Sequence, residues 1–177
     1  PGAVELVRRL LDTGKPFLVL TNSASRLPDT LAGELADWGL PVPASRILTS
    51  GVLLADWFRA EGLAGAGCLV LGTPDSEEYV RRAGGRVLDG EGGADAEVVV
   101  IADQKGFPCI ERMDLVLSLA LSRLDAGSPL HLLLCNPDLI YPVGPGRYGF
   151  TAGGLAAMLE AAVLQRYPSM ETPLVRL

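Results

Sequence analysis

Two polar clusters in the sequence place hydroxyl and amide side chains at the ends of apolar runs. The first is Thr21, Asn22 and Ser23, which directly follow the short apolar run at residues 17–20. A hydroxyl and successive backbone N–H groups at such a point can surround an anionic oxygen, above all that of a phosphate. Clusters of Asn and Ser also commonly turn the chain and cap the next helix, so both interpretations stay open here.

The second cluster, Asn136-Pro137-Asp138, follows the apolar run at residues 130–135. Because a residue before proline is driven toward extended geometry, Pro137 directs the loop and can present Asn136 or Asp138 to a ligand. An Asx-Pro turn explains the same residues. Asp103, after the apolar run at residues 98–101, stands where a nucleophilic carboxylate could lie, although a solvated turn aspartate is the simpler interpretation.

Other chemistries find little support in the sequence. His131 is the only histidine and begins an apolar run, which favours a structural role over a metal site or a Ser-His-Asp triad. The three cysteines, Cys68, Cys109 and Cys135, form no CxxC pair, so neither a zinc site nor a redox dithiol is indicated. The glycine pairs fit neither the dinucleotide-binding nor the P-loop fingerprint.

Short apolar runs alternate with helical periodicity along the chain. We expect helices at 3–13, 27–38, 50–58, 75–83, 110–126 and 153–167, strands at 17–20, 46–49, 68–71, 86–88, 97–102 and 130–135, and a loop at 136–150. This alternation predicts an α/β fold with a parallel sheet, in which ligands bind at the carboxyl ends of the strands. Both polar clusters lie at such ends.

The composition narrows the choice of partners and of compartment. The 177 residues include 21 Asp and Glu against 15 Lys and Arg, for a net charge of −6, and 49% are hydrophobic. This length suits one large domain or two small ones. An acidic chain lacks long-range attraction to nucleic acid and to anionic lipid, so we expect neither as a partner. The absence of a long apolar run and the separated cysteines favour a cytoplasmic protein.

The order of the segments resembles a known family. The segments are LTNSASR, ILTSGVLLADWF, CLVLGT, VVVIAD, CNPDLIYP and TAGGLAAMLEAA, and as a set they resemble the haloacid dehalogenase-like phosphatases with a class IIA cap. That branch includes p-nitrophenylphosphatases, pyridoxal phosphate and phosphoglycolate phosphatases, and nucleotide monophosphatases. The resemblance implies part of a Rossmann-like core at residues 1–63, an inserted α/β cap domain at 64–169, and a return strand to the core at 170–177.

The resemblance also implies a Mg²⁺-dependent phosphatase that cleaves small phosphate monoesters through an aspartyl-phosphate intermediate. Thr21 and Asn22, with Ser23 adjacent, match the family motif that binds the transferring phosphoryl group. Asn136 and Asp138 match the cap loop that faces the active site and helps to select the substrate. A small phosphorylated metabolite is then the expected partner, and the resemblance leaves room for a homodimer formed through the cap.

Three further family motifs are missing from the sequence: the DxD nucleophile, the lysine that follows a later core strand in a GKP context, and the GDxxxxD loop that completes the Mg²⁺ site. Lys15 lies in a Gly-Lys-Pro triplet, but at the opposite end of its strand from Thr21, roughly 15 Å away at ~3.3 Å per residue. We therefore assign no catalytic or metal-binding residue within the chain.

From the missing motifs we expect a fragment whose open sheet edge exposes backbone and apolar surface. The main alternative is a catalytically inactive scaffold of the same fold that binds a phosphorylated ligand or a partner. A weaker alternative is a sugar- or nucleotide-binding α/β domain.

Overall fold

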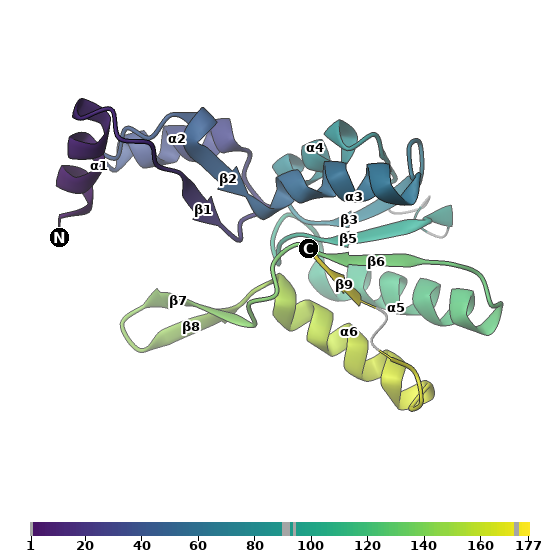
Figure 1. Ribbon diagram of the computed structural model, residues 1–177. Helices are drawn as coiled ribbons and strands as arrows, with labels where there is room; N and C mark the ends of the chain where they lie inside the picture. Colours follow the sequence, from purple (N-terminus) through teal and green to yellow (C-terminus); the bar gives the residue numbers. More distant parts are fainter. Residues whose placement is uncertain (1, 90–92, 94, 172–173) are drawn as a thin grey trace.

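The chain folds into helices and strands that alternate along most of its length (Figure 1). The computed structural model describes residues 2–89, 93, 95–171 and 174–177. Its elements are α1 (Ala3–Asp12), β1 (Val19–Thr21), α2 (Pro28–Asp37), β2 (Ile47–Thr49), α3 (Leu53–Glu61), β3 (Gly67–Leu71), α4 (Pro74–Arg82), β4 (Arg86–Val87), β5 (Val98–Ile101), α5 (Cys109–Asp125), β6 (His131–Leu134), β7 (Ile140–Gly144), β8 (Arg147–Phe150), α6 (Ala152–Arg166) and β9 (Leu174–Arg176). The α/β fold class expected from the sequence is confirmed.

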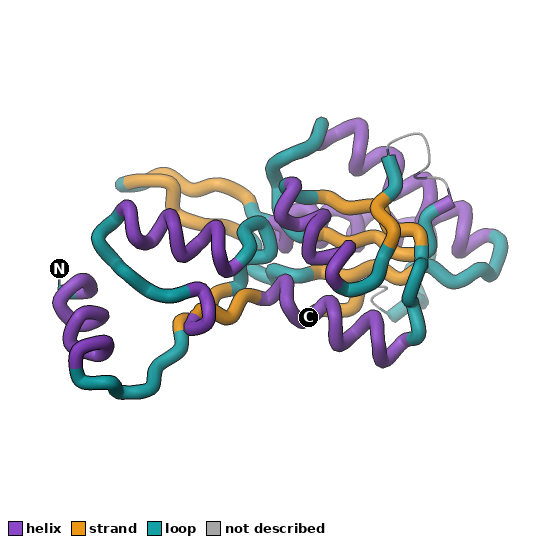
Figure 2. Tube along the Cα trace, turned by 90° about the horizontal axis from the view of Figure 1, so that it is seen from above, coloured by secondary structure: helices purple, strands orange, loops and turns teal. Residues whose placement is uncertain are grey.

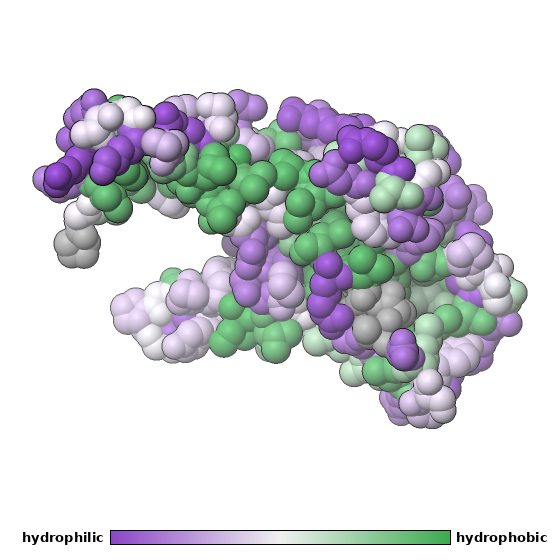
Figure 3. All heavy atoms as spheres, viewed as in Figure 1, coloured by the Kyte–Doolittle hydropathy of each residue, from purple (hydrophilic) through white to green (hydrophobic). Residues whose placement is uncertain are grey.

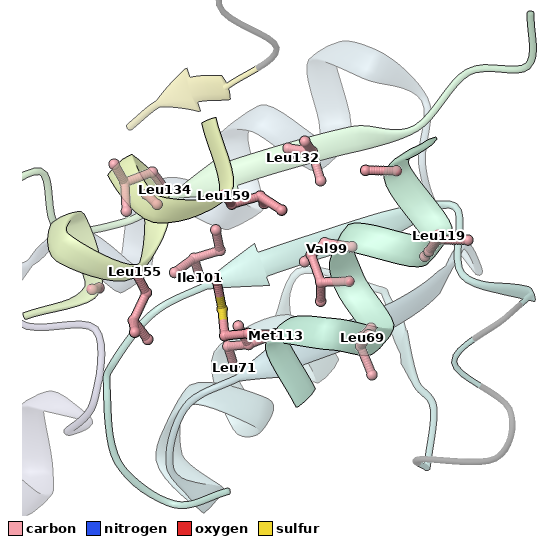
Figure 4. Packing of buried hydrophobic residues seen from close by; sticks show 14 of the residues in the cluster. Leu69, Leu71, Val99, Ile101, Met113, Leu119, Leu132, Leu134, Leu155 and Leu159 are labelled. Carbon is pink, nitrogen blue, oxygen red and sulfur yellow. The ribbon is translucent and has the colours of Figure 1, made fainter. Parts of the chain in front are cut away.

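The larger sheet has five parallel strands in the order β4-β3-β5-β6-β9. Its central strands are almost wholly apolar, as parallel strands covered by helices on both faces must be. Alternate residues point to opposite faces, so one core forms against α5 and α6 and another against α3 and α4. Figure 4 shows the first core, which includes Leu69, Leu71, Val99, Ile101, Met113, Leu119, Leu132, Leu134, Leu155 and Leu159.

The smaller sheet consists of β1 and β2, which run parallel with Thr21 beside Thr49. It lies with α1 and α2 in a part of the chain set apart from the larger sheet, as the view from above shows (Figure 2). Leu20 in β1 is 71% exposed, and Leu18, just before the strand, is 62% exposed. The expected exposed apolar surface is therefore present.

The register of the larger sheet sets the position of its loops. Leu71, Ile101 and Leu134 are register partners at the carboxyl ends of β3, β5 and β6. The loops that follow these strands consequently leave the sheet at one edge. The loop that follows β1 meets them there, which brings segments far apart in the sequence into one place.

The structure corrects the expectation for residues 136–150, which we predicted as loop. They contain an antiparallel hairpin of β7 and β8, with Pro142 paired with Tyr148. Proline is tolerated there because a two-stranded ribbon has only edge strands. The hairpin projects away from the larger sheet (Figure 1).

Two further elements lie near the boundaries of the expected domain plan. The strand predicted within 170–177 forms, but β9 pairs with β6 in the larger sheet and does not join β1; residues 172 and 173 lie outside the described residues. This pairing satisfies backbone groups along the edge of β6 that would otherwise be open.

The helix α3 packs on the larger sheet through Leu54 and Phe58, although the predicted boundary at 63/64 assigns it to the other domain. The division into 1–63 and 64–169 stays a prediction.

Across the described ranges, no helix combines the length and the apolar character needed to cross a lipid bilayer.

Candidate functional site

A polar cleft of about 680 Å³ lies between the two sheets, where the carboxyl ends of their strands meet. It is lined by residues 21–26 after β1, 73–75 after β3, 102–105 after β5, and Asn136 and Asp138 after β6. Figure 3 shows a hollow on this face of the molecule, between the N-terminal part of the chain and the β7–β8 hairpin. Ligands of open α/β sheets bind at this kind of edge, so the cleft is the candidate functional site.

Thr21, Asn22 and Ser23 all line this cleft, at the point where β1 ends. The Thr21 hydroxyl oxygen accepts a hydrogen bond from the Ser23 N–H at 3.3 Å, and among the described hydrogen bonds none uses the Thr21 hydroxyl as donor. The Ser50 hydroxyl donates to the Asn22 carbonyl at 2.9 Å, which fixes the turn against the segment that follows β2. The Thr21 hydroxyl hydrogen is therefore available to an oxygen atom in the cleft.

Asn136 and Asp138 also line the cleft, and they follow β6 of the larger sheet. The Asp138 N–H donates to the Asn136 side-chain oxygen at 2.9 Å, so the Asx turn considered for these residues is present. The Asp138 carboxylate also accepts a hydrogen bond from the Asn22 amide at 3.3 Å. The two predicted site segments, 116 residues apart, are thus in direct contact.

Side chains of α4 and its N-terminal cap hold the segment that follows the Thr21 cluster. We call Thr73, Asp75, Ser76 and Tyr79 the α4 clamp. Three of them donate hydroxyl hydrogen bonds to consecutive backbone carbonyls. Ser76 donates to Ala24 at 2.8 Å, Thr73 to Ser25 at 2.7 Å and Tyr79 to Arg26 at 2.7 Å. The Asp75 carboxylate accepts from the next N–H, that of Leu27, at 2.8 Å. The clamp therefore fixes four consecutive residues directly after the Thr21 cluster.

Tyr79 links the clamp to the smaller sheet. Its single hydroxyl hydrogen goes to the Arg26 carbonyl, which can only accept, so the Thr49 hydroxyl must be the donor in the 2.6 Å contact with Tyr79. Burial raises the pKa of Tyr79, which keeps the phenol protonated and able to donate. Thr49 is only 2% exposed, and it pairs with Thr21 in the sheet. Tyr79 therefore braces the end of β2 against the segment that follows β1.

We expect Tyr79→Phe to destabilise the protein by about 1–3 kcal/mol, because the Thr49 hydroxyl and the Arg26 carbonyl both lose their partner. Urea unfolding followed by circular dichroism measures this change. Tyr148→Phe is the matched control, since Tyr148 is 68% exposed and should give no measurable shift. Equal stability of the two variants would contradict the bracing role of Tyr79.

The described residues do not fit a metal centre. No group of three or more His, Cys, Asp or Glu among them could hold a metal ion. The cleft carboxylates already accept hydrogen bonds: Asp75 from Leu27, Asp103 from Lys105 at 2.9 Å and Asp138 from Asn22. We therefore derive no step through Mg²⁺ from these residues.

Cys68 and Cys135 are also unsupported as thiol nucleophiles. Burial raises the pKa of Cys68 to about 11 and that of Cys135 to about 12, so both thiols stay protonated near neutral pH. His131 lies at the start of β6 with its ring edge-on to Trp57, at 5.3 Å between ring centroids. This placement agrees with the structural role expected for His131.

Both polar clusters singled out in the sequence line the cleft. Asp103 lines the cleft, where its carboxylate accepts from the Lys105 N–H in a turn. Lys15 is absent from the described cleft lining, as expected from its place at the other end of β1. The α4 clamp was not predicted. The Thr73–Ser76 spacing of a helix cap was its only local signal, and the cap is present.

Several known proteins resemble this chain in sequence. Residues 1–86 match the family model of the haloacid dehalogenase-like hydrolases. The ribonucleotide monophosphatase NagD of Escherichia coli is 28% identical over 107 residues, which cover 60% of this chain and 40% of that protein. The 5′-nucleotidase YutF of Bacillus subtilis is 32% identical over 99 residues, 56% of this chain and 37% of that protein. The matches thus span about two fifths of the length of these relatives.

Solved structures share the fold. A possible sugar phosphatase of the haloacid dehalogenase superfamily from Cytophaga hutchinsonii superimposes with a TM-score of 0.80 at 23% identity, covering 99% of this chain and 60% of that one. A p-nitrophenyl phosphatase from Archaeoglobus fulgidus gives 0.70 at 24% identity, covering 97% and 59%. Fold and site define an α/β protein with a polar cleft between the carboxyl ends of two parallel sheets. Residues 1–86, just under half of the chain, are similar to the haloacid dehalogenase-like hydrolases.

Proposed function

We propose that the protein containing this chain is a phosphatase of small phosphate monoesters. The observation that carries the proposal is the direct contact of the Thr21–Ser23 turn with the Asn136–Asp138 loop across one cleft. Hydroxyl and backbone N–H donors that are fixed in advance stabilise the charge of a transferring phosphoryl group. The Thr21 hydroxyl and the Asn22 N–H donate to the phosphoryl oxygens, and Asn136 and Asp138 contact the leaving group.

The α4 clamp supports this role, because it fixes the backbone beyond Ser23 before a substrate binds. Donors that do not reorganise during the reaction act most strongly on a transition state. The proposal includes transfer of the phosphoryl group to an aspartate and Mg²⁺ dependence, with those carboxylates supplied from outside the described residues. Both features rest on the match of residues 1–86 to the family model.

The domain plan, location and assembly belong to the same proposal. Two separate parallel sheets support a division into a core part and a class IIA cap. The three free cysteines support a cytoplasmic location. Exposed apolar side chains on β7 and β8, among them Ile140 and Phe150, support a homodimer through the cap.

The test is hydrolysis by the complete protein, purified from its source, of a panel of small phosphate monoesters. We expect phosphate release that needs Mg²⁺ and stops when EDTA removes it. Binding of inorganic phosphate without turnover of any ester would favour the catalytically inactive scaffold. Absence of both turnover and binding would contradict the proposal.

A further inference from the structure

Lys105 lies in the cleft on a loop whose backbone is closely held. The loop follows β5, and Asp103 accepts the Lys105 N–H at 2.9 Å. Gly106 adopts φ +93° and packs so tightly on the end of β3 that an added Cβ would lie 2.4 Å from the Gly72 carbonyl oxygen. A loop held at both points presents the Lys105 side chain from a fixed position.

Of the two cations in the described cleft lining, Lys105 is the one without an ion-pair partner. Arg26, the other cation of the described lining, is bound to Glu34 at 2.6 Å. Lys105 has no carboxylate within ion-pair distance among the described residues, and its ammonium group lies 5.9 Å from the centroid of the Tyr141 ring. An aromatic face favours a cation near it and leaves the other directions of the ammonium open. Lys105 is therefore free to pair with an anion that enters the cleft.

We propose that Lys105 and Tyr141 form a subsite for a second anionic group, a carboxylate or a phosphate, on the leaving group of the substrate. This inference rests on the proposed phosphatase function. The transferring phosphoryl group is assigned to Thr21 and Asn22, at the end of β1 in the smaller sheet. Lys105 follows β5 of the larger sheet, and Tyr141 lies in β7 of the hairpin. Tyr141 comes three residues after Asp138, which contacts the Thr21 turn through Asn22.

Three-carbon esters test the subsite in the complete protein. Propyl phosphate has no second charge, 3-phosphooxypropanoate adds a carboxylate, and propane-1,3-diol bisphosphate adds a phosphate. We expect kcat/KM to favour the doubly anionic esters, and Lys105→Gln to reduce this preference about tenfold, a difference of about 1.4 kcal/mol. The ester with the larger loss identifies the group that Lys105 binds.

Matched variants separate the subsite from general charge effects. Lys15→Gln removes the same charge from the only other lysine, outside the described cleft lining, and should keep the preference. Lys105→Arg should keep most of the preference for the doubly anionic esters. Tyr141→Leu should lower this preference by a smaller factor than Lys105→Gln does. An equal loss of kcat/KM for all three esters in Lys105→Gln would place Lys105 at the transferring phosphoryl group and overturn the proposal, as would an unchanged preference.

A binding measurement keeps this inference distinct from the proposed function. If no ester is hydrolysed, the phosphatase proposal fails, and calorimetry with 3-phosphonopropanoate and propylphosphonate judges the subsite alone. Tighter binding of the carboxylated compound that disappears in Lys105→Gln supports the subsite. Equal affinities of the two compounds for the unmodified protein overturn it.

Discussion

Thr21→Val should lower the kcat of the complete protein for its best phosphate ester by about 100- to 1000-fold, the usual effect of removing one donor to a developing oxyanion. Valine keeps the branched shape and the strand preference of threonine but cannot donate a hydrogen bond. The hydroxyl makes only a 3.3 Å contact with the Ser23 N–H, so its loss should hardly change the fold. Steady-state kinetics and the unfolding midpoint measure the two effects separately.

Two variants control this prediction. Thr21→Ser keeps the hydroxyl and should retain most of the turnover. Thr13→Val removes a hydroxyl that donates to the Arg9 carbonyl at the end of α1, outside the cleft, and should leave kcat unchanged. Full turnover by Thr21→Val would remove Thr21 from the proposed site.

Gly153→Ala should destabilise the protein by about 3 kcal/mol through overpacking. Gly153 lies in the first turn of α6, where an added Cβ would be 2.3 Å from the Asp138 carbonyl oxygen and 2.5 Å from that of Pro137. Neither group is a flexible side chain, so the backbone of this loop must move. The Thr151 hydroxyl, which donates to the Asp138 carbonyl, would move with it. Urea unfolding of the complete protein measures the loss.

Gly33→Ala is the matched control, because Gly33 lies inside α2 and an added Cβ there would meet no atom within 4 Å. Alanine at this helical position should stabilise the protein by about 0.5–1 kcal/mol. Both variants replace glycine with alanine, and their changes in the free energy of unfolding should have opposite signs. A loss below about 0.5 kcal/mol in Gly153→Ala would contradict the close packing of α6 on the Asn136–Asp138 loop.

The regular part of the fold was predictable because its signals are local. Runs such as 98–101 are apolar throughout, which is typical of strands covered on both faces, and they alternate with helical periodicity. Parallel strands place their carboxyl ends at one edge, so Thr21 and Asn136 were both expected near a ligand site. The direct contact between their two segments, made by Asn22 and Asp138, could not be derived from either segment alone.

The unpredicted features depend on long-range contacts. Tyr79 reaches a carbonyl 53 residues away, and nothing near Tyr79 in the sequence indicates this partner. The β7–β8 hairpin was missed because Pro142 argues against a strand, although an edge position tolerates it. For β9 the prediction of a strand was confirmed, while its neighbour, β6, is a matter of sheet assembly that the sequence of residues 174–177 does not encode.

The turn after β1 is proposed to bind a phosphoryl group. The most direct test is a crystal structure of the complete protein with tungstate, located by its anomalous scattering. We predict an oxyanion in the cleft with oxygen atoms about 3 Å from the Thr21 hydroxyl and the Asn22 N–H. Tungstate bound only elsewhere, with this turn in contact with none of it, would contradict the claim.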